Sequence, residues 1–299
     1  MNIETGSIVI GSQRCNAQCP FCIASLTPSC GTNVYEEPDL TKFPHFVSLA
    51  ARCSVTTILL TGKGEPTLFP DDILSYLDFL HKRSTKDIPI FPFVELQTNG
   101  ILFDSDNMKN TEWTEERLHL LHKLGLTTIC ISVVHWEKEK NQSIYQPHGK
   151  YMDLEKVIAL LHKCGFMVRL SCMALKNYID TPEKLSLMLD FVKANGVKQF
   201  TIRNISRPES RCQNDVDRFV RSHALSKQES FALEKYCEDH GDCIMELSFG
   251  AKVYDINGQN CGWFNCLTTS LKTNSMRQII FFPDGSIHWD WKYAGSVLL

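Results

Sequence analysis

Short apolar runs alternate with amphipathic stretches over the first two thirds of the chain. Apolar runs at 7–11, 55–62, 91–100, 127–134, 166–175 and 198–205 predict six strands, because short runs bounded by turn residues are typical of buried strands. Stretches with helical spacing follow most of them, at 70–83, 111–125, 153–165 and 181–196. Strands and helices in such a series predict parallel strands joined by right-handed crossovers.

The number of these units limits the architecture. Six units are too few for a closed eight-unit barrel, so we predict an α/β fold with an open, partial (βα)6 parallel barrel over residues 1–206. A last helix at 226–241 and a β-hairpin turning at Pro283-Asp284-Gly285 predict a C-terminal extension over 207–299. This extension is a candidate lid, in which Trp263, Trp289 and Trp291 would pack or contact substrate.

Composition excludes several classes of protein. The formal net charge of −3 gives no electrostatic footprint for a polyanion, so a nucleic-acid partner is disfavoured. The sequence has neither a long apolar span nor a signal peptide, which predicts no membrane partner and a cytoplasmic location. In such a chain we interpret the 13 cysteines as reduced thiols, some of which bind metal.

Three cysteines follow the first predicted strand in the stretch "RCNAQCPFC", at Cys15, Cys19 and Cys22. Three thiolates on one loop can hold three irons of a cubane cluster and leave the fourth iron open. An open coordination position is typical of a catalytic metal site. A zinc knuckle with a distant fourth ligand, or buried cysteines without metal, are the alternatives that the spacing leaves open.

The cysteine spacing, with Phe21 before the last cysteine, resembles the signature of the radical S-adenosylmethionine (SAM) enzymes. Three further stretches resemble the motifs of this family in the family's order: "TGKGEPTL" at 61–68 is similar to its Gly-Gly-Glu-Pro motif, and "QTNGIL" at 97–102 and "ISV" at 131–133 to its third- and fourth-strand motifs. The resemblance covers roughly residues 6–206. All these stretches fall at predicted strand ends, where the site of such a barrel forms.

The resemblance implies both chemistry and residues. Cys15, Cys19 and Cys22 would hold one [4Fe-4S] cluster, whose open iron would chelate SAM. One electron from a low-potential donor of the flavodoxin or ferredoxin type would then cleave SAM to a 5′-deoxyadenosyl radical that abstracts hydrogen from substrate. Lys63 stands where a glycine is common in the family, and no catalytic residue is assigned. The candidate SAM-binding residues are Phe21, Gly62, Gly64, Glu65, Asn99, Ser132 and Arg169.

The alternation of side chains along a strand predicts which residues face the barrel interior. Glu95, Gln97, Arg169, Ser171, Thr201 and Arg203 should face inward, and their apolar neighbours outward. The inward charges form either a buried ion-pair network or a site for the SAM carboxylate and a polar substrate, with Arg169 as the stronger candidate. We interpret Cys130 and Cys172 as small core residues, and His135 and Trp136 as packing or pocket-lining residues.

Within the family, the chain resembles the branch that holds the GTP-cyclising enzyme of molybdenum-cofactor biosynthesis and the SPASM-domain peptide maturases. Ile8 and Leu59 stand where the cyclising enzyme has arginines, and the ending "AGSVLL" differs from its Gly-Gly tail. Cys261 and Cys266 could be ligands of a second cluster. However, "HWDW" at 288–291 lacks the cysteine expected after the hairpin turn, so we expect no second cluster.

Three functions stay open at this point. The first is a tailoring enzyme for a ribosomal peptide or a small metabolite, which the acidic balance and the lack of a nucleic-acid module favour. The second is modification of a nucleotide or tRNA, which predicts salt-dependent RNA binding. The third is a non-catalytic iron–sulfur or zinc protein on the same fold, which predicts no SAM cleavage.

Overall fold

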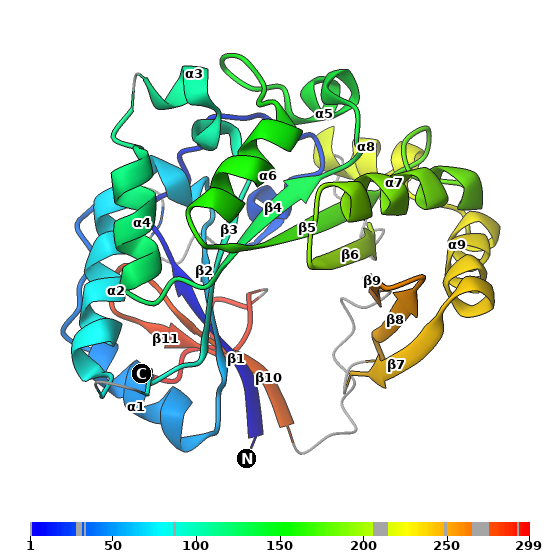
Figure 1. The fold of residues 1–299 in the computed structure, drawn as a ribbon. Coiled ribbons are helices and arrows are strands. Elements are labelled where there is room, and N and C mark those ends of the chain that lie inside the picture. Colours follow the sequence, from blue (N-terminus) through cyan, green and yellow to red (C-terminus); the bar gives the residue numbers. More distant parts are fainter. Residues whose placement is uncertain are drawn as a thin grey trace.

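The computed structural model describes residues 2–27, 32, 34–85, 88–109, 111–205, 215–247, 250–264, 275–291 and 293–299. In this part of the chain, 11 strands form one curved sheet in the order β11-β10-β1-β2-β3-β4-β5-β6-β9-β8-β7. The sheet does not close on itself, and helices cover its outer face (Figure 1). The six strands from β1 to β6 are parallel neighbours in sequence order, which confirms the predicted partial barrel.

The barrel strands are β1 (Asn2–Val9), β2 (Thr57–Thr61), β3 (Phe93–Thr98), β4 (Thr128–Val133), β5 (Met167–Ala174) and β6 (Gln199–Asn204). The helices between them are α1 (Phe43–Arg52), α2 (Pro70–Arg83), α3 (Ser105–Met108), α4 (Glu115–Lys123), α5 (Lys138–Tyr145), α6 (Leu154–Lys163) and α7 (Pro182–Ala194). Short 3-10 turns lie at η1 (Ile23–Leu26), η2 (Pro66–Leu68) and η3 (Ile101–Phe103). Then come α8 (Asp215–His223), α9 (Lys227–His240), β7 (Asp242–Glu246), β8 (Lys252–Ile256), β9 (Gln259–Phe264), β10 (Ser275–Phe281) and β11 (Ile287–His288).

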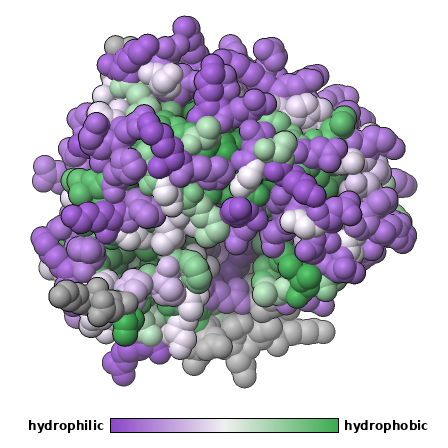
Figure 2. Space-filling model, viewed as in Figure 1, coloured by the Kyte–Doolittle hydropathy of each residue, from purple (hydrophilic) through white to green (hydrophobic). Residues whose placement is uncertain are grey.

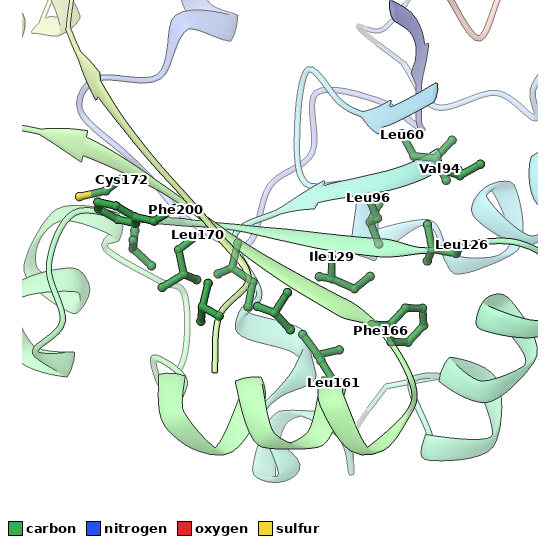
Figure 3. Packing of buried hydrophobic residues seen from close by; sticks show 14 of the residues in the cluster. Leu60, Val94, Leu96, Leu126, Ile129, Leu161, Phe166, Leu170, Cys172 and Phe200 are labelled. Atoms are coloured by element: carbon green, nitrogen blue, oxygen red, sulfur yellow. The ribbon is translucent and has the colours of Figure 1, made fainter. Parts of the chain in front are cut away.

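The main hydrophobic core lies between the sheet and its helices. Leu96, Ile129, Leu170 and Phe200 come from four successive strands and are fully buried on the helix side, where they face Leu161 of α6 (Figure 3). Their burial confirms the predicted alternation on β3, β5 and β6, because the residues between them point to the other face. That other face is the inside of the open barrel, which we call the lumen.

The C-terminal extension joins both edges of the barrel sheet. β10 pairs in parallel with β1, with Ser7 opposite Ile280, and β9 pairs in parallel with β6, with Thr201 opposite Gly262. β10 and β11 form the predicted hairpin, in which Gly285 adopts the positive φ of 78° that its turn requires. The division of the chain at residue 206 stays a prediction, since the strands on either side of it share one sheet.

β1 begins at Asn2 and not at residue 7 as predicted, because Asn2 and Ile3 pair with the N-terminal end of β10. No helix among the described residues is long and apolar enough to cross a membrane.

Candidate active site

The cysteine loop leaves the C-terminal end of β1 and crosses the mouth of the barrel. Backbone hydrogen bonds hold it on two sides. The amide of Glu65, after β2, donates to the carbonyl of Arg14 at 2.9 Å. On the far side, Gln18 donates to Tyr145 and His148 donates to Asn16, each at 2.9 Å. The loop is therefore tied both to the end of β2 and to the segment that follows α5.

The three thiols of this loop are reduced and close together. Cys15 and Cys19 are half-buried, and Cys22 is exposed. Burial, reinforced by Glu65, raises the pKa of Cys15 to about 11, and burial, reinforced by Cys15, raises the pKa of Cys19 to about 12. Metal binding would release these protons, because thiolate is the form that binds metal.

The three thiols of the cysteine loop are ligands of the kind that an iron–sulfur cluster takes. Among the described residues, no three Cys, His, Asp or Glu side chains converge on one point as a single metal ion requires. A [4Fe-4S] cluster needs no such point, since each thiolate binds a different iron. Three neighbouring thiols on one loop supply three such ligands.

Gly64 is where the cysteine loop meets the end of β2. A Cβ atom built on Gly64 would lie 2.0 Å from the carbonyl oxygen of Arg14, the residue before the first cysteine. At Gly62 the crowding is milder, with the carbonyl oxygen of Gly64 at 3.0 Å. The glycine at position 64 therefore lets two backbone segments touch, a role that comes in addition to any contact with SAM.

Glu65 is a buried carboxylate, and both of its oxygens accept hydrogen bonds from other residues of the protein. Its Oε1 accepts hydrogen bonds from the backbone and hydroxyl of Thr67, at 3.0 and 2.7 Å, and from the hydroxyl of Thr98 at 2.6 Å. Its Oε2 accepts from the backbone of Asn99 at 2.9 Å. Burial raises the pKa of Glu65, and these bonds oppose that rise. The side chain thus joins the ends of β2 and β3, while the backbone amide of Glu65 joins the end of β2 to the cysteine loop.

The other predicted SAM-binding residues differ in how many contacts their side chains make within the protein. The amide of Asn99 donates to Asn16 at 2.7 Å and its oxygen accepts from Ile101 at 3.0 Å, so it ties the end of β3 to the cysteine loop. Phe21 packs edge-on against Tyr145, with ring centroids 6.1 Å apart. Ser132 on β4 makes no side-chain hydrogen bond to a described residue and stays open to the lumen.

Inside the lumen, Arg169 forms an ion pair. Its Nη1 lies 3.2 Å from the carboxylate of Glu95, and its Nε–H donates to the thiol of Cys130 at 3.3 Å. Gln97 donates to the other oxygen of Glu95 at 3.0 Å. The predicted inward direction of these side chains is confirmed, and the ion-pair network is the alternative that the geometry of Arg169 supports. Its part in SAM binding stays a prediction.

The cysteines outside the loop lie in different surroundings. Cys172 is fully buried on the helix side of β5, as predicted, whereas Cys130 faces the lumen and contacts Arg169. Cys261 on β9 is fully buried on the helix side, where its thiol interacts with that of Cys237 on α9. Cys266 lies outside the described residues.

The C-terminal segment reaches the cysteine loop through Lys63. The Nζ of Lys63 lies 5.3 Å from the centroid of the Trp291 ring and donates to the hydroxyl of Thr27. Trp291 also packs against Phe282, while Trp289 is 43% exposed. Trp263 packs in the core on the helix side of β9. Of the three tryptophans named for a lid, Trp291 is therefore the one that contacts the predicted SAM motif.

Figure 2 shows the face of the molecule that looks into the open side of the barrel. It is hollowed near its centre, where hydrophilic residues line the floor of the hollow. A second hollow of about 390 Å³ lies beside the end of β6, between Asn204 and α9.

Comparison with known proteins assigns the family. Residues 9–189, more than half of the chain, match the family described as the Radical SAM superfamily. The chain belongs to this superfamily. The match contains the cysteine loop and the motifs at the ends of β2, β3 and β4.

The chain is similar to GTP 3′,8-cyclase of Aquifex aeolicus (strain VF5), with 28% identity over 210 residues. This match covers 69% of the chain and 57% of the relative, so the chain spans little more than half of that protein. Among solved structures, anSMEcpe with bound AdoMet has a TM-score of 0.64 at 15% identity, over 97% of this chain and 75% of its own. SuiB of Streptococcus suis, bound to its precursor peptide SuiA, has a TM-score of 0.61 at 14% identity, over 96% of this chain and 59% of its own.

Both structural neighbours share the fold of this chain. Sequence reasoning missed Thr98 and Asn16 as supports of the site. Thr98 lies within the "QTNG" stretch, so the sequence already places it near the site. Only the structure shows that its hydroxyl donates to Glu65.

Proposed function

We propose that this protein is a radical SAM enzyme that holds one [4Fe-4S] cluster on Cys15, Cys19 and Cys22 and modifies a peptide or a small metabolite in a biosynthetic step. The observation that carries the proposal is the position of the cysteine loop. Its half-buried thiols lie over the barrel mouth, tied to the ends of β2 and β3 through Gly64 and Asn99.

The chain's own residues would bind, orient and shield the reactants. When bound and reduced, the cluster supplies the electron that cleaves the S–C5′ bond of SAM, so that the resulting 5′-deoxyadenosyl radical takes a hydrogen atom from substrate. The backbone at 62–65 and the free hydroxyl of Ser132 are the groups that we expect to contact SAM. The lumen would hold the substrate below, away from water and oxidants.

The electron donor that we expect is a low-potential protein of the flavodoxin or ferredoxin type. A partner of this kind docks reversibly, so the exposed Cys22 side of the cysteine loop is where we expect it to approach.

A nucleotide substrate is the second candidate, and the 28% identity with GTP 3′,8-cyclase favours it. A structured RNA is disfavoured, because the formal net charge of −3 leaves no general attraction for a polyanion. A nucleotide would need cationic side chains in the lumen, where Arg169 and Arg203 lie.

The test compares wild-type protein with Cys22→Ala after anaerobic reconstitution with iron and sulfide. Both are reduced with dithionite and given SAM, and iron and 5′-deoxyadenosine are quantified. Cys243→Ala, which removes another exposed thiol on β7, is the matched control. We expect wild type and Cys243→Ala to retain iron and release 5′-deoxyadenosine, and Cys22→Ala to do neither. Iron without SAM cleavage in all three, with candidate peptides and nucleotides present, would support a non-catalytic protein instead.

A further inference from the structure

Arg203 on β6 is a lumen-facing cation that the described residues leave without an ion pair. Phe200 and Ile202 on the same strand are fully buried on the helix side, which directs Arg203 inward. Its Nε is buried and has no hydrogen-bond partner. A buried N–H donor without an acceptor is costly, so a ligand is the simplest way to satisfy the Nε of Arg203.

Glu95, the carboxylate whose charge acts on Arg203, already forms an ion pair with another arginine. Glu95 pairs with Arg169 at 3.2 Å and also accepts from Gln97. Burial lowers the pKa of Arg203, and the positive charge of Arg169 lowers it further, with the weaker field of Glu95 acting in the opposite direction. Glu95 therefore neutralises Arg169, and Arg203 has no carboxylate partner among the described residues.

The ring of Phe264 on β9 lies against the guanidinium of Arg203. Phe264 is the residue directly opposite Arg203 in the sheet, and its ring centroid lies 5.5 Å from the Arg203 guanidinium carbon. The ring lies over Gly262, where a Cβ would meet it at 2.7 Å. A guanidinium that lies against an aromatic ring can still direct its N–H groups to two oxygens of one anion.

Two hydroxyl groups lie on the same face of the sheet, one pair of residues two positions before Arg203 and its neighbour Met173. Ser171 on β5 and Thr201 on β6 are paired neighbours in the sheet and face the lumen. Neither makes a side-chain hydrogen bond to a described residue. They are the next available donors to an oxyanion bound at Arg203.

We propose that Arg203, beside the ring of Phe264, binds an oxyanion of the substrate, a carboxylate or a phosphate, and so selects anionic substrates for the lumen. This assignment rests on the proposed function, because it takes the lumen to be the substrate site. Arg169 has a different role here: it neutralises Glu95 and shapes the wall beside the anion.

The test uses the full chain, anaerobic and reconstituted, as wild type, Arg203→Met and Arg203→Lys. The probes are inorganic phosphate and malonate, each compared with sodium chloride at equal ionic strength, and the readout is the midpoint of thermal unfolding. A ligand that binds the folded state raises this midpoint. We expect both probes to raise the midpoint of thermal unfolding of the wild type by several degrees. The increase should be smaller in Arg203→Lys. In Arg203→Met it should be no larger than the increase that sodium chloride produces.

Without any probe, Arg203→Met should unfold at or above the wild-type midpoint, because it removes an unpaired charge. Equal responses to the probes in wild type and Arg203→Met would overturn the proposal, as would no response in wild type. A larger increase with inorganic phosphate than with malonate would indicate a phosphate group on the substrate, and the reverse would indicate a carboxylate. SAM binding, measured by titration, should be unchanged in Arg203→Met; its loss would mean that the anion is the carboxylate of SAM and would overturn the substrate assignment.

The two proposals fail separately. SAM cleavage by wild type with probe responses that do not depend on Arg203 contradicts only the anion site. Responses that depend on Arg203 in a protein that never cleaves SAM contradict only the proposed enzyme.

Discussion

The ammonium group of Lys63 lies over the ring of Trp291, 5.3 Å from its centroid, and so joins the loop after β2 to the C-terminal segment. Lys63 is only 5% exposed, although lysine is seldom buried. A cation on an aromatic face is stabilised more strongly when water is excluded from it. The C-terminal segment is therefore anchored at the motif that we expect to bind SAM.

Trp291→Ala should loosen this anchor. We expect the free energy of unfolding to fall by about 2 kcal/mol, through lost packing and a lost cation–π contact, and proteolysis near the C-terminus to become faster. Urea unfolding and limited proteolysis measure both effects. Trp289→Ala is the control, since this tryptophan is 43% exposed and should change stability by no more than about 0.5 kcal/mol. Equal effects of the two substitutions would contradict the anchor.

Arg169→Met should be strongly destabilising. It leaves the carboxylate of Glu95 buried without its cation, and breaking such a pair from one side costs about 3–5 kcal/mol. Urea unfolding measures the loss. The double variant Glu95→Gln/Arg169→Met removes both charges and should recover most of it. If the double variant is as unstable as the single one, the ion pair is not the reason.

Gly64→Ala should separate the cysteine loop from the end of β2. The added Cβ would meet the carbonyl oxygen of Arg14 at 2.0 Å, backbone against backbone, which no side-chain rotation relieves. We expect iron content after reconstitution to fall severalfold while circular dichroism shows the sheet intact. Gly149→Ala is the matched control, because a Cβ there meets no atom within 4 Å. Full iron content in Gly64→Ala would show that the loop does not depend on this contact.

His288 should make stability depend on pH. Its ring nitrogens lie 3.2 and 3.1 Å from the hydroxyls of Ser296 and Ser286, and burial lowers its pKa below the ordinary value of 6.5. The unfolded chain therefore takes up a proton first as the pH falls below 6.5, and stability decreases from there towards the lower folded pKa. Urea unfolding at pH 7.5 and 5.5, values above and below the ordinary histidine pKa of 6.5, should show a smaller loss of stability for His288→Gln than for wild type. An equal loss in both proteins would assign the effect to other groups.

Much of the barrel could be predicted from local sequence, because its strands are short apolar runs and its inward polar residues break them at every second position. Arg169 and Cys172, on opposite faces of β5, are examples. The edges could not be predicted in this way. β9 is a strand because it pairs with β6, and β1 begins at Asn2 because it pairs with β10, and both partners are distant in sequence.

The site was predictable in its residue types but not in its internal bonds. The cysteine spacing and the "TGKGEP" stretch locate the site, yet nothing local indicates that Glu65 is satisfied by Thr67, Thr98 and Asn99. The roles of the two arginines also depend on distant residues. Glu95 neutralises Arg169, whereas Arg203 faces Phe264 of a strand that local patterns do not predict.

The central claim is that the thiols of the cysteine loop support cleavage of SAM. The most direct measurement is the amount of 5′-deoxyadenosine formed per protein, under anaerobic reduction, by wild type and by Cys22→Ala at equal protein concentration. We predict product from wild type and none above background from Cys22→Ala, with Cys243→Ala equal to wild type. Equal product from wild type and Cys22→Ala, with equal iron in both, would contradict the account.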